Sequence, residues 1–114
     1  MDASSSATKM FSALQSQQSL RSQIATTLLS SGLTLYQDGN YTHAVAAFKQ
    51  ASAYVPENTD AYNYAAKAYL KLGKTKEAVD SYKISLSIDR SQSDIWVELG
   101  NVYYSEKRYA EAEN

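Results

Sequence analysis

Apolar and polar residues follow one another along this chain in a pattern that predicts a series of helices joined by short turns. In residues 25–38 the apolar side chains recur every three to four positions, which places them on one face of a helix. That pattern stops at Gly39, since glycine readily adopts the left-handed conformation that ends helices. Further helices are predicted over 41–54, between Asn58 and Leu72, over 75–88, and from Ser93 onward.

The helical pattern repeats at an offset of 34 residues. Residues 59–92 contain one complete helix–turn–helix unit, and the unit before it has side chains of matching size and polarity at the same places. The matching pairs are Leu28 and Tyr62, Gly32 and Ala66, Leu35 and Tyr69, Gly39 and Gly73, Ala44 and Ala78, Val45 and Val79, Phe48 and Tyr82, and Ala51 and Ser85. The same offset leads on to Trp96, Gly100, Tyr103 and Ala112. Self-similarity at this period is typical of repeat architectures.

These residues resemble the fingerprint of the tetratricopeptide repeat family. The third unit carries it most fully, with Trp96, Leu99-Gly100 and Tyr103. The resemblance covers residues 25–114 and departs from the family pattern at Leu28, Ser31 and Arg90. It implies an all-α fold, an α-α superhelix (solenoid) of antiparallel helix pairs. The implied parts are a Ser/Gln-rich segment at 1–24 and three repeats at 25–58, 59–92 and 93–114, the last truncated in its second helix.

Small and large residues alternate where paired helices are expected to cross. Gly32 and Ala44 are small where two helices approach closely, and Phe48 is large where a gap must be filled. Tyr82 takes the place of Phe48 in the next unit. Truncating Tyr82 to alanine is therefore expected to cost about 3–5 kcal/mol of stability.

The third unit is expected to end early. Its first helix is expected to have Ser93 as N-cap and to end in a turn at residues 106–108, followed by only about six residues of a second helix. An array without a polar capping helix exposes apolar surface. We therefore expect either that the chain is a fragment of a longer array, or that another chain covers Leu99, Val102 and Tyr103. Both alternatives predict association at high concentration.

Residues 1–24 are rich in serine and glutamine, a composition that favours a disordered tail. Three apolar side chains of this segment nevertheless fall on the 34-residue register of the second helices, namely Met10, Phe11 and Leu14. We therefore expect a helix from about Ala7 that packs as a cap against the helix at 25–38. The alternative is one unbroken helix from Ser6 into the first repeat, because no glycine or proline interrupts the segment.

The charge balance argues against nucleic acid and membrane as partners. Eleven basic and twelve acidic residues give a net charge of −1 with the two signs interspersed, whereas proteins that bind phosphate backbones need a basic surface. No stretch reaches membrane-spanning length, and the first ten residues lack the parts of a signal peptide. A cytoplasmic location is therefore expected. The absence of cysteine excludes disulfides and thiolate sites.

The sequence contains partial matches to functional motifs, but the residues at the required positions do not fit. Gly73-Lys74-Thr75 resembles the end of a phosphate-binding loop, but Ala68 replaces the required earlier glycine. A stretch of Asp and Ser imitates a calcium loop, but Asp94 and Gly100 stand where a glycine and a glutamate are needed. His43 has no second ligand or nucleophile at a useful spacing. We therefore expect a protein that is not an enzyme and that has no catalytic residue, cofactor or metal site.

The resemblance also implies where a partner binds. In this family the first helices of successive repeats build the concave wall of a right-handed superhelix. Besides Thr26, the residues that would line this groove are Leu29, Leu33, Tyr36, Asn63, Lys67, Leu70, Val97, Asn101 and Tyr104. Family members that hold the C-terminal carboxylate of chaperones use a Lys, Asn and Arg set, and those positions are occupied here by Leu29, Leu33, Tyr64, Asp94 and Glu98. The groove is therefore not expected to be of the chaperone carboxylate-clamp type.

Two functions remain after this reasoning. The first is a scaffold or adaptor whose groove binds a protein or peptide partner, with apolar contacts, amides for the peptide backbone and Lys67 for one carboxylate. An alternative for Leu29, Leu33 and Tyr36 is packing against the N-terminal segment or a neighbouring helix. The second function is self-assembly into homo-oligomers through the uncapped repeat end and the N-terminal segment.

Overall fold

The computed structural model describes residues 3–113, with all their side chains except those at positions 3, 109 and 111–113. Within this range the chain forms five helices and no strand. The helices are α1 (Ala3–Gln37), α2 (Tyr41–Tyr54), α3 (Thr59–Lys71), α4 (Thr75–Ile88) and α5 (Ser93–Glu113). The expected all-α helical solenoid is confirmed.

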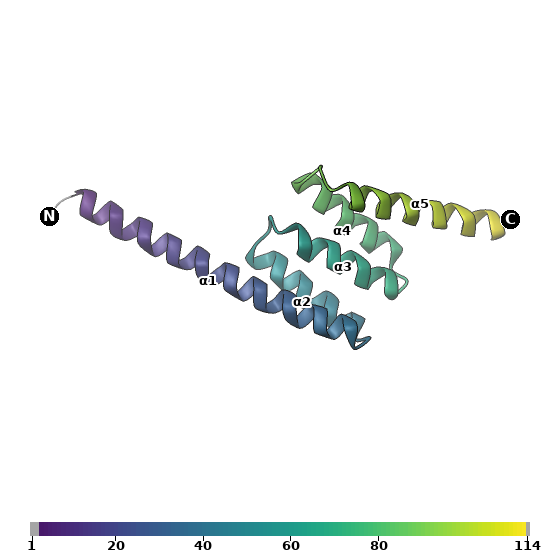
Figure 1. The fold of residues 1–114 in the computed structure, drawn as a ribbon, viewed down its shortest axis with the longest axis horizontal. Helices are drawn as coiled ribbons and strands as arrows, with labels where there is room; N and C mark the ends of the chain where they lie inside the picture. Colours follow the sequence, from purple (N-terminus) through teal and green to yellow (C-terminus); the bar gives the residue numbers. More distant parts are fainter. Residues whose placement is uncertain (1–2, 114) are drawn as a thin grey trace.

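The helices stack one on the next as antiparallel neighbours (Figure 1). Contacts run in chain order, from α1 to α2, α2 to α3, α3 to α4 and α4 to α5. The N-terminal half of α1 and the C-terminal half of α5 project beyond the stack at its two ends. As a result the molecule is elongated and measures 76 × 30 × 18 Å.

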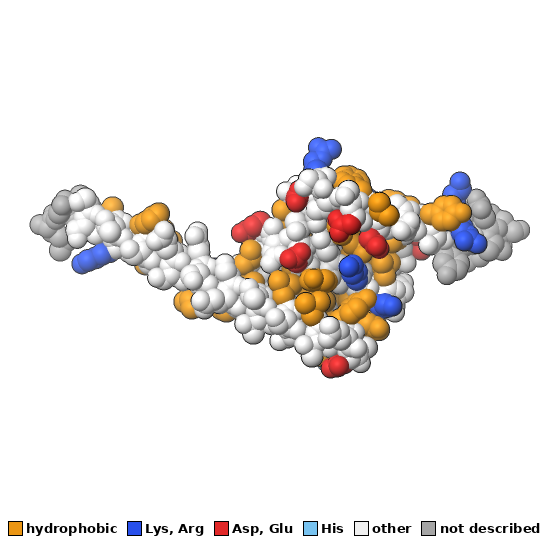
Figure 2. Space-filling view, in the orientation of Figure 1, with side chains coloured by type: hydrophobic (Ala, Val, Ile, Leu, Met, Phe, Trp, Pro, Cys, Tyr) orange, Lys and Arg blue, Asp and Glu red, His pale blue; other side chains and the backbone are white. Residues whose placement is uncertain are grey.

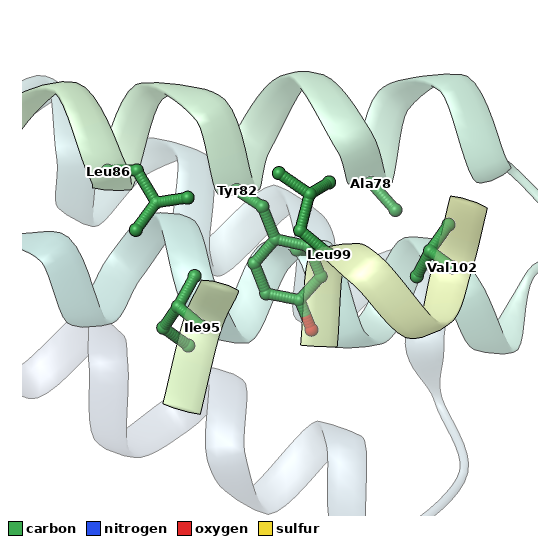
Figure 3. Packing of buried hydrophobic residues seen from close by; sticks show 7 residues of the cluster. Ala78, Tyr82, Leu86, Ile95, Leu99 and Val102 are labelled. Atoms are coloured by element: carbon green, nitrogen blue, oxygen red, sulfur yellow. The ribbon is translucent and has the colours of Figure 1, made fainter. Parts of the chain in front are cut away.

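Apolar clusters between successive helices make up the core. Phe48 of α2 lies at the centre of the cluster that joins α1, α2 and α3. Tyr82 of α4 lies among Leu86, Ile95 and Leu99, which attaches α5 to α4 (Figure 3). Because the clusters connect one helix pair to the next, each pair is stabilised by its neighbour, as in other repeat arrays.

Gly32 allows α1 and α2 to approach closely. A Cβ atom at this position would lie 2.7 Å from Cδ1 and 2.9 Å from Cζ of Phe48, and nearer still to Cε1. Phe48 is fully buried and stacks on Tyr64 with the ring centroids 5.6 Å apart. The ring is held between Gly32 and Tyr64, and the small and large residues interlock as the sequence pattern predicts.

Glycines in the left-handed conformation end α1 and α3. The φ angle is +81° at Gly39 and +73° at Gly73. After Gly73, the backbone N–H of Lys74 donates to the carbonyl oxygen of Tyr69 at 2.9 Å, which closes the turn. This geometry is costly for residues that carry a Cβ atom.

The prediction of a turn at residues 106–108 is wrong. The helix α5 runs without a break from Ser93 to Glu113. The position 34 residues after Gly73 holds Lys107, whose Cβ atom disfavours the left-handed conformation that both earlier turns use. The helix therefore continues. Ala112, expected at the start of a second packing face, lies outside the described side chains.

The prediction of a separate capping helix from Ala7 is also wrong, and the unbroken helix is what forms. The helix α1 continues from Ala3 to Gln37. It contains no proline, and its single glycine, Gly32, lies against Phe48 rather than in a turn. Nothing in the sequence stops the helix, and residues 4–24 are exposed along its length. This segment is neither a disordered tail nor a cap.

One helix start has a side-chain cap, and another differs from the prediction. Asn58 is the N-cap of α3, and its side-chain oxygen accepts a hydrogen bond from the N–H of Asp60 at 3.0 Å. Ser93, expected as the N-cap of α5, is instead its first helical residue. Gln92 takes the cap position, and its carbonyl oxygen accepts from the N–H of Ile95 at 3.1 Å.

Candidate functional site

The three apolar candidates on α1 lie half-buried beside α2 and α3. Leu29, Leu33 and Tyr36 pack against the cluster around Phe48, and the Tyr36 ring meets Tyr41 edge-on with the centroids 5.2 Å apart. Packing against a neighbouring helix is therefore present. Packing against the N-terminal segment is not, because that segment belongs to the same straight helix. The exposed remainder of these side chains leaves an apolar strip on α1.

Asn63 of α3 is buried and hydrogen-bonded within the protein. The residue is 8% exposed, and its Nδ2 donates to Oε1 of Gln92 at 2.9 Å. Gln92 in turn donates from Nε2 to Oγ of Ser85 at 3.0 Å and to the carbonyl oxygen of Asp89 at 2.9 Å. This network joins α3, α4 and the loop before α5. The Nδ2 of Asn63, a residue predicted to line the groove, is thus paired within the chain, whereas its Oδ1 is buried without a hydrogen-bond partner.

Lys67 and Leu70 follow on the same helix. Lys67 is exposed, and its ammonium nitrogen lies 5.8 Å from the centroid of the Tyr64 ring, within the range of cation–π attraction. Leu70 is half-buried and lines a groove of about 310 Å³ together with Glu98 and Asn101 of α5. The gap between α3 and α5 therefore offers an apolar floor with polar side chains on one wall.

The helix α5 presents three exposed candidates. Val97 is 61% exposed and Tyr104 is 64% exposed, and Asn101 between them is also exposed. The spacing of these three residues places them on one face of the helix. The guanidinium carbon of Arg108 lies 5.9 Å from the Tyr104 ring centroid, which leaves the other ring face free for a contact.

Charged side chains of both signs surround the apolar ones (Figure 2). Apolar side chains gather over the middle of the stack, and acidic and basic side chains are interspersed around them. No group of three or more acidic or histidine side chains in the described part of the chain could hold a metal ion. No helix among those residues is long and apolar enough to cross a bilayer.

Two titratable groups in the described part of the chain have a perturbed pKa, and both shifts have structural explanations. Burial, with smaller contributions from the nearby Glu98 and Tyr36, raises the pKa of Tyr82 to about 12. The Tyr82 hydroxyl is buried without a hydrogen-bond partner, and a phenol that stays protonated far above neutral pH is no general base. Hydrogen bonds from the hydroxyl and the N–H of Ser91 lower the pKa of Asp89, which is a loop interaction.

A second apolar surface lies on another face of α5. None of the predicted groove residues belongs to it. Trp96, Leu99 and Tyr103 line, with Leu86 of α4, a groove of about 590 Å³. Trp96 and Tyr103 are core positions in the repeat pattern, yet each is 47% exposed because no described helix covers them. The sequence signal that could have revealed this surface was the absence of a glycine at position 107, where a turn to a covering helix was expected.

Comparisons with known proteins agree with this architecture. A tetratricopeptide repeat family model matches residues 29–94, and no curated protein matches the sequence. The second tetratricopeptide domain of Spaghetti (RPAP3), solved with the HSP90 peptide SRMEEVD, is similar with a TM-score of 0.74 and 24% identity, over 87% of this chain and 90% of that chain. The first such domain of the same protein, solved with the same peptide, has a TM-score of 0.72 and 23% identity, over 80% and 74%.

The tetratricopeptide domain of OM64 from Arabidopsis is a further structural neighbour. Its TM-score is 0.73 with 22% identity, over 81% of this chain and 76% of that chain. These three similarities concern the fold, whereas the family model matches the sequence itself over more than half of its length. The chain therefore belongs to the tetratricopeptide repeat family.

Proposed function

We propose that this chain is a non-catalytic scaffold that binds a partner polypeptide along the surface formed by α1, α3 and α5. Tetratricopeptide repeats are in general interaction modules, and two of the structural neighbours were solved with a bound peptide. The observation that carries the proposal is the exposure of Val97 and Tyr104 on one face of α5. Apolar and aromatic side chains left open to water beside polar ones are typical of a protein contact.

The chemistry of the surface defines the kind of partner. Leu29 and Leu33 offer an apolar strip, and Tyr104 offers a large contact area at a low cost in side-chain entropy. Asn101 can bond to a peptide backbone, and Lys67 can bind one carboxylate. We therefore expect an extended or helical segment with at least one bulky apolar residue and one acidic residue.

The proposed groove differs from a chaperone carboxylate clamp. Such a clamp needs cationic and amide side chains, but Leu29, Leu33 and Tyr64 are apolar or aromatic at those positions, and Asp94 and Glu98 carry the wrong charge. A peptide carboxylate placed beside Asp94 and Glu98 would be repelled. The peptide SRMEEVD, which the two Spaghetti domains hold, is expected not to bind this chain measurably.

A peptide-display selection against the whole chain tests the groove. Selected peptides are expected to lose at least about tenfold in affinity with Lys67→Glu, and to weaken with Asn101→Ala. Lys49→Glu and Gln50→Ala on α2 make the same chemical changes at exposed positions off the proposed surface, and they are expected to leave affinity unchanged. Selected peptides that are indifferent to both groove substitutions would refute the assignment.

A second candidate function is self-assembly. The observation that favours it is the location of the exposed large apolar side chains, most of which lie on the two projecting helices. On α1 these are Met10, Phe11, Leu14, Leu20 and Ile24, and on α5 they are Trp96, Val97, Tyr103 and Tyr104. Static light scattering over a concentration series tests it, with a rise in average mass expected, and a constant monomer mass would exclude it.

A further inference from the structure

One face of α5 has the form of a seat for a helix. The seat consists of Trp96, Gly100 and Tyr103, flanked by Leu99 and by Leu86 of α4. Helical spacing places Gly100 on the same face as Trp96 and Tyr103. Beside it lies a groove of about 590 Å³ that is lined by Trp96, Leu99, Tyr103 and Leu86, together with Lys83, Ser87 and Arg90. The indole N–H of Trp96 already donates to the carbonyl oxygen of Arg90 at 2.9 Å, so the rest of that ring can meet an apolar side chain without leaving a donor unpaired.

Gly100 leaves open space on the seat face of α5. Gly32, at the same repeat position on α1, is filled by the Phe48 ring, whereas a Cβ atom at Gly100 would meet nothing within 4 Å. A glycine inside a helix costs about 1 kcal/mol relative to alanine. Gly32 offsets that cost through the close approach of α2. No described helix makes the corresponding approach to Gly100.

The projecting part of α1, residues 3–20, carries an apolar face of its own. We call it the arm. Met10, Phe11 and Leu14 lie five turns, or about 18 residues, before Leu28, Leu29 and Gly32, so both sets share one face of α1. The later set packs on α2.

The interface of α1 with α2 stops before the arm begins. At the end of α2, Arg21 lies over the Tyr54 ring at 5.4 Å and its Nε donates to the Tyr54 carbonyl oxygen at 3.3 Å. Beyond this point the same face of α1 continues with nothing on it, and Leu14 is 56% exposed. The arm is therefore an unpaired extension of an existing helix–helix interface.

The arm matches the helix that the seat lacks. Counting in steps of 34 residues, Leu14 takes the place of Phe48 and Tyr82, the two largest fully buried side chains. Phe11 takes the place of two valines on the same scale, Val45 and Val79. Met10 stands where the repeats have alanine, and its flexible thioether can adapt to a tight crossing.

Charge does not oppose this match. Lys83 and Arg90 border the seat. Between residues 7 and 20 the arm has one charged residue, Lys9, at the repeat position of the exposed Glu77. Lys9 would therefore point away from the seat, and the neutral serine and glutamine side chains of the arm would face Lys83 and Arg90.

We propose that the arm of one copy packs as an amphipathic helix on the α5 seat of a second copy, with Leu14 over Gly100. The proposal rests on the second candidate function and specifies its two contacting surfaces. The contact is heterologous, since each copy offers a different surface, so repetition gives either a closed ring or an open chain of copies. The mass distribution is expected to grow with concentration instead of stopping at a dimer, unless a ring closes.

Two pairs of substitutions test the surfaces in the full chain by sedimentation velocity. Leu14→Lys is compared with Leu20→Lys, because both residues lie on the arm at 56% and 57% exposure but Leu20 lies on another face. Tyr103→Lys is compared with Tyr104→Lys, since Tyr103 lines the seat and Tyr104 does not. We expect the first member of each pair to raise the dissociation constant at least about tenfold and the second to leave it unchanged.

Mixing the two disabling variants gives the sharpest outcome. Leu14→Lys keeps an intact seat and Tyr103→Lys keeps an intact arm, so each alone is expected to be monomeric and the mixture to form a 1:1 dimer and nothing larger. Circular dichroism checks that both variants remain helical, as expected for substitutions at exposed positions.

Three results would overturn the proposal. Association of Tyr103→Lys alone would indicate pairing of arm with arm. Association that resists both substitutions would leave self-assembly standing but remove the arm and the seat. A monomeric wild-type chain at every concentration would remove self-assembly together with this arrangement.

Discussion

The packing of Gly32 against Phe48 makes a quantitative prediction about two glycines at the same repeat position. In an exposed helix interior, replacing glycine by alanine stabilises a protein by about 1 kcal/mol. Gly100→Ala should show this gain, since its Cβ atom would meet nothing within 4 Å. Gly32→Ala should show the same gain in helix propensity, but its Cβ atom would lie less than 3 Å from three ring atoms of Phe48.

The size of the steric penalty follows from the burial of Phe48. The ring is fully buried and stacked on Tyr64, so relief requires a movement of the ring away from Tyr64 or a shift of the α1–α2 pair. Inserting a methyl group into a filled core costs about 1–3 kcal/mol. Because the propensity term is common to both sites, the difference in unfolding free energy between Gly100→Ala and Gly32→Ala should equal this penalty, with Gly32→Ala the less stable.

The assay is urea unfolding followed by circular dichroism at 222 nm, at a protein concentration where each chain is a monomer. A third variant, Gly32→Ala with Phe48→Leu, provides an internal control. In the Phe48→Leu background the added methyl group has more room, so its penalty should shrink. If Gly32→Ala stabilises the chain as much as Gly100→Ala does, the interlocking of Gly32 with Phe48 is not what positions α2 on α1.

Three further predictions concern other buried or strained positions. The pKa of Tyr82 is raised from 10.0 to about 12 by burial, so the folded state keeps this proton where the unfolded chain loses it. Its contribution to stability is complete below pH 10 and falls by up to about 3 kcal/mol as the pH rises from about 10 to 12. Tyr82→Phe should remove that part of the pH dependence in urea titrations. At pH 7 its free energy of unfolding should lie within about 1 kcal/mol of wild type, since the hydroxyl has no partner. An unchanged pH profile would contradict this. Gln92→Ala should lower the free energy of unfolding by about 1–3 kcal/mol in the same assay, because it leaves Asn63 Nδ2 and Ser85 unpaired. A loss no greater than that of the exposed control Gln50→Ala would contradict a stabilising role for this network. Gly73→Ala should destabilise by about 1 kcal/mol, opposite in sign to Gly100→Ala, because Gly73 has a φ of +73°; a stabilised variant would mean that the turn relaxes without cost.

The sequence was sufficient to predict the fold because the repeat encodes it locally. The 34-residue spacing, the turn at Gly39 and the small-to-large match of Gly32 with Phe48 all appear in the sequence and in the structure. Each depends on residues close together in the chain or on a packing rule that recurs from one unit to the next. Local rules of this kind can be read without coordinates.

The wrong predictions arose where the repeat register was followed against a local signal. At position 107 the register predicted a turn, but Lys107 cannot replace glycine cheaply in the left-handed conformation, so α5 continues. In the N-terminal segment the register predicted a cap, but no residue between Ala3 and Gly32 ends the helix. In both places the signal for an unbroken helix was present in the sequence.

The candidate site was less predictable than the fold. Asn63 has the spacing of a groove residue, yet the side chain of Gln92 reaches it from 29 positions later in the chain. Side-chain contacts over that separation depend on how α3 and α4 are placed relative to the loop before α5. Exposed residues such as Val97 and Tyr104 needed no such contact, and the helical spacing alone placed them on one face of α5.

The projecting ends of α1 and α5 also affect how the chain moves in solution. A compact chain of this length has a radius of gyration of about 13 Å, whereas the Cα atoms of this structure give 18.6 Å. A single copy therefore diffuses slowly for its mass and leaves a gel-filtration column early, in the range of a larger compact protein. An apparent dimer judged from elution volume alone can thus be one extended chain.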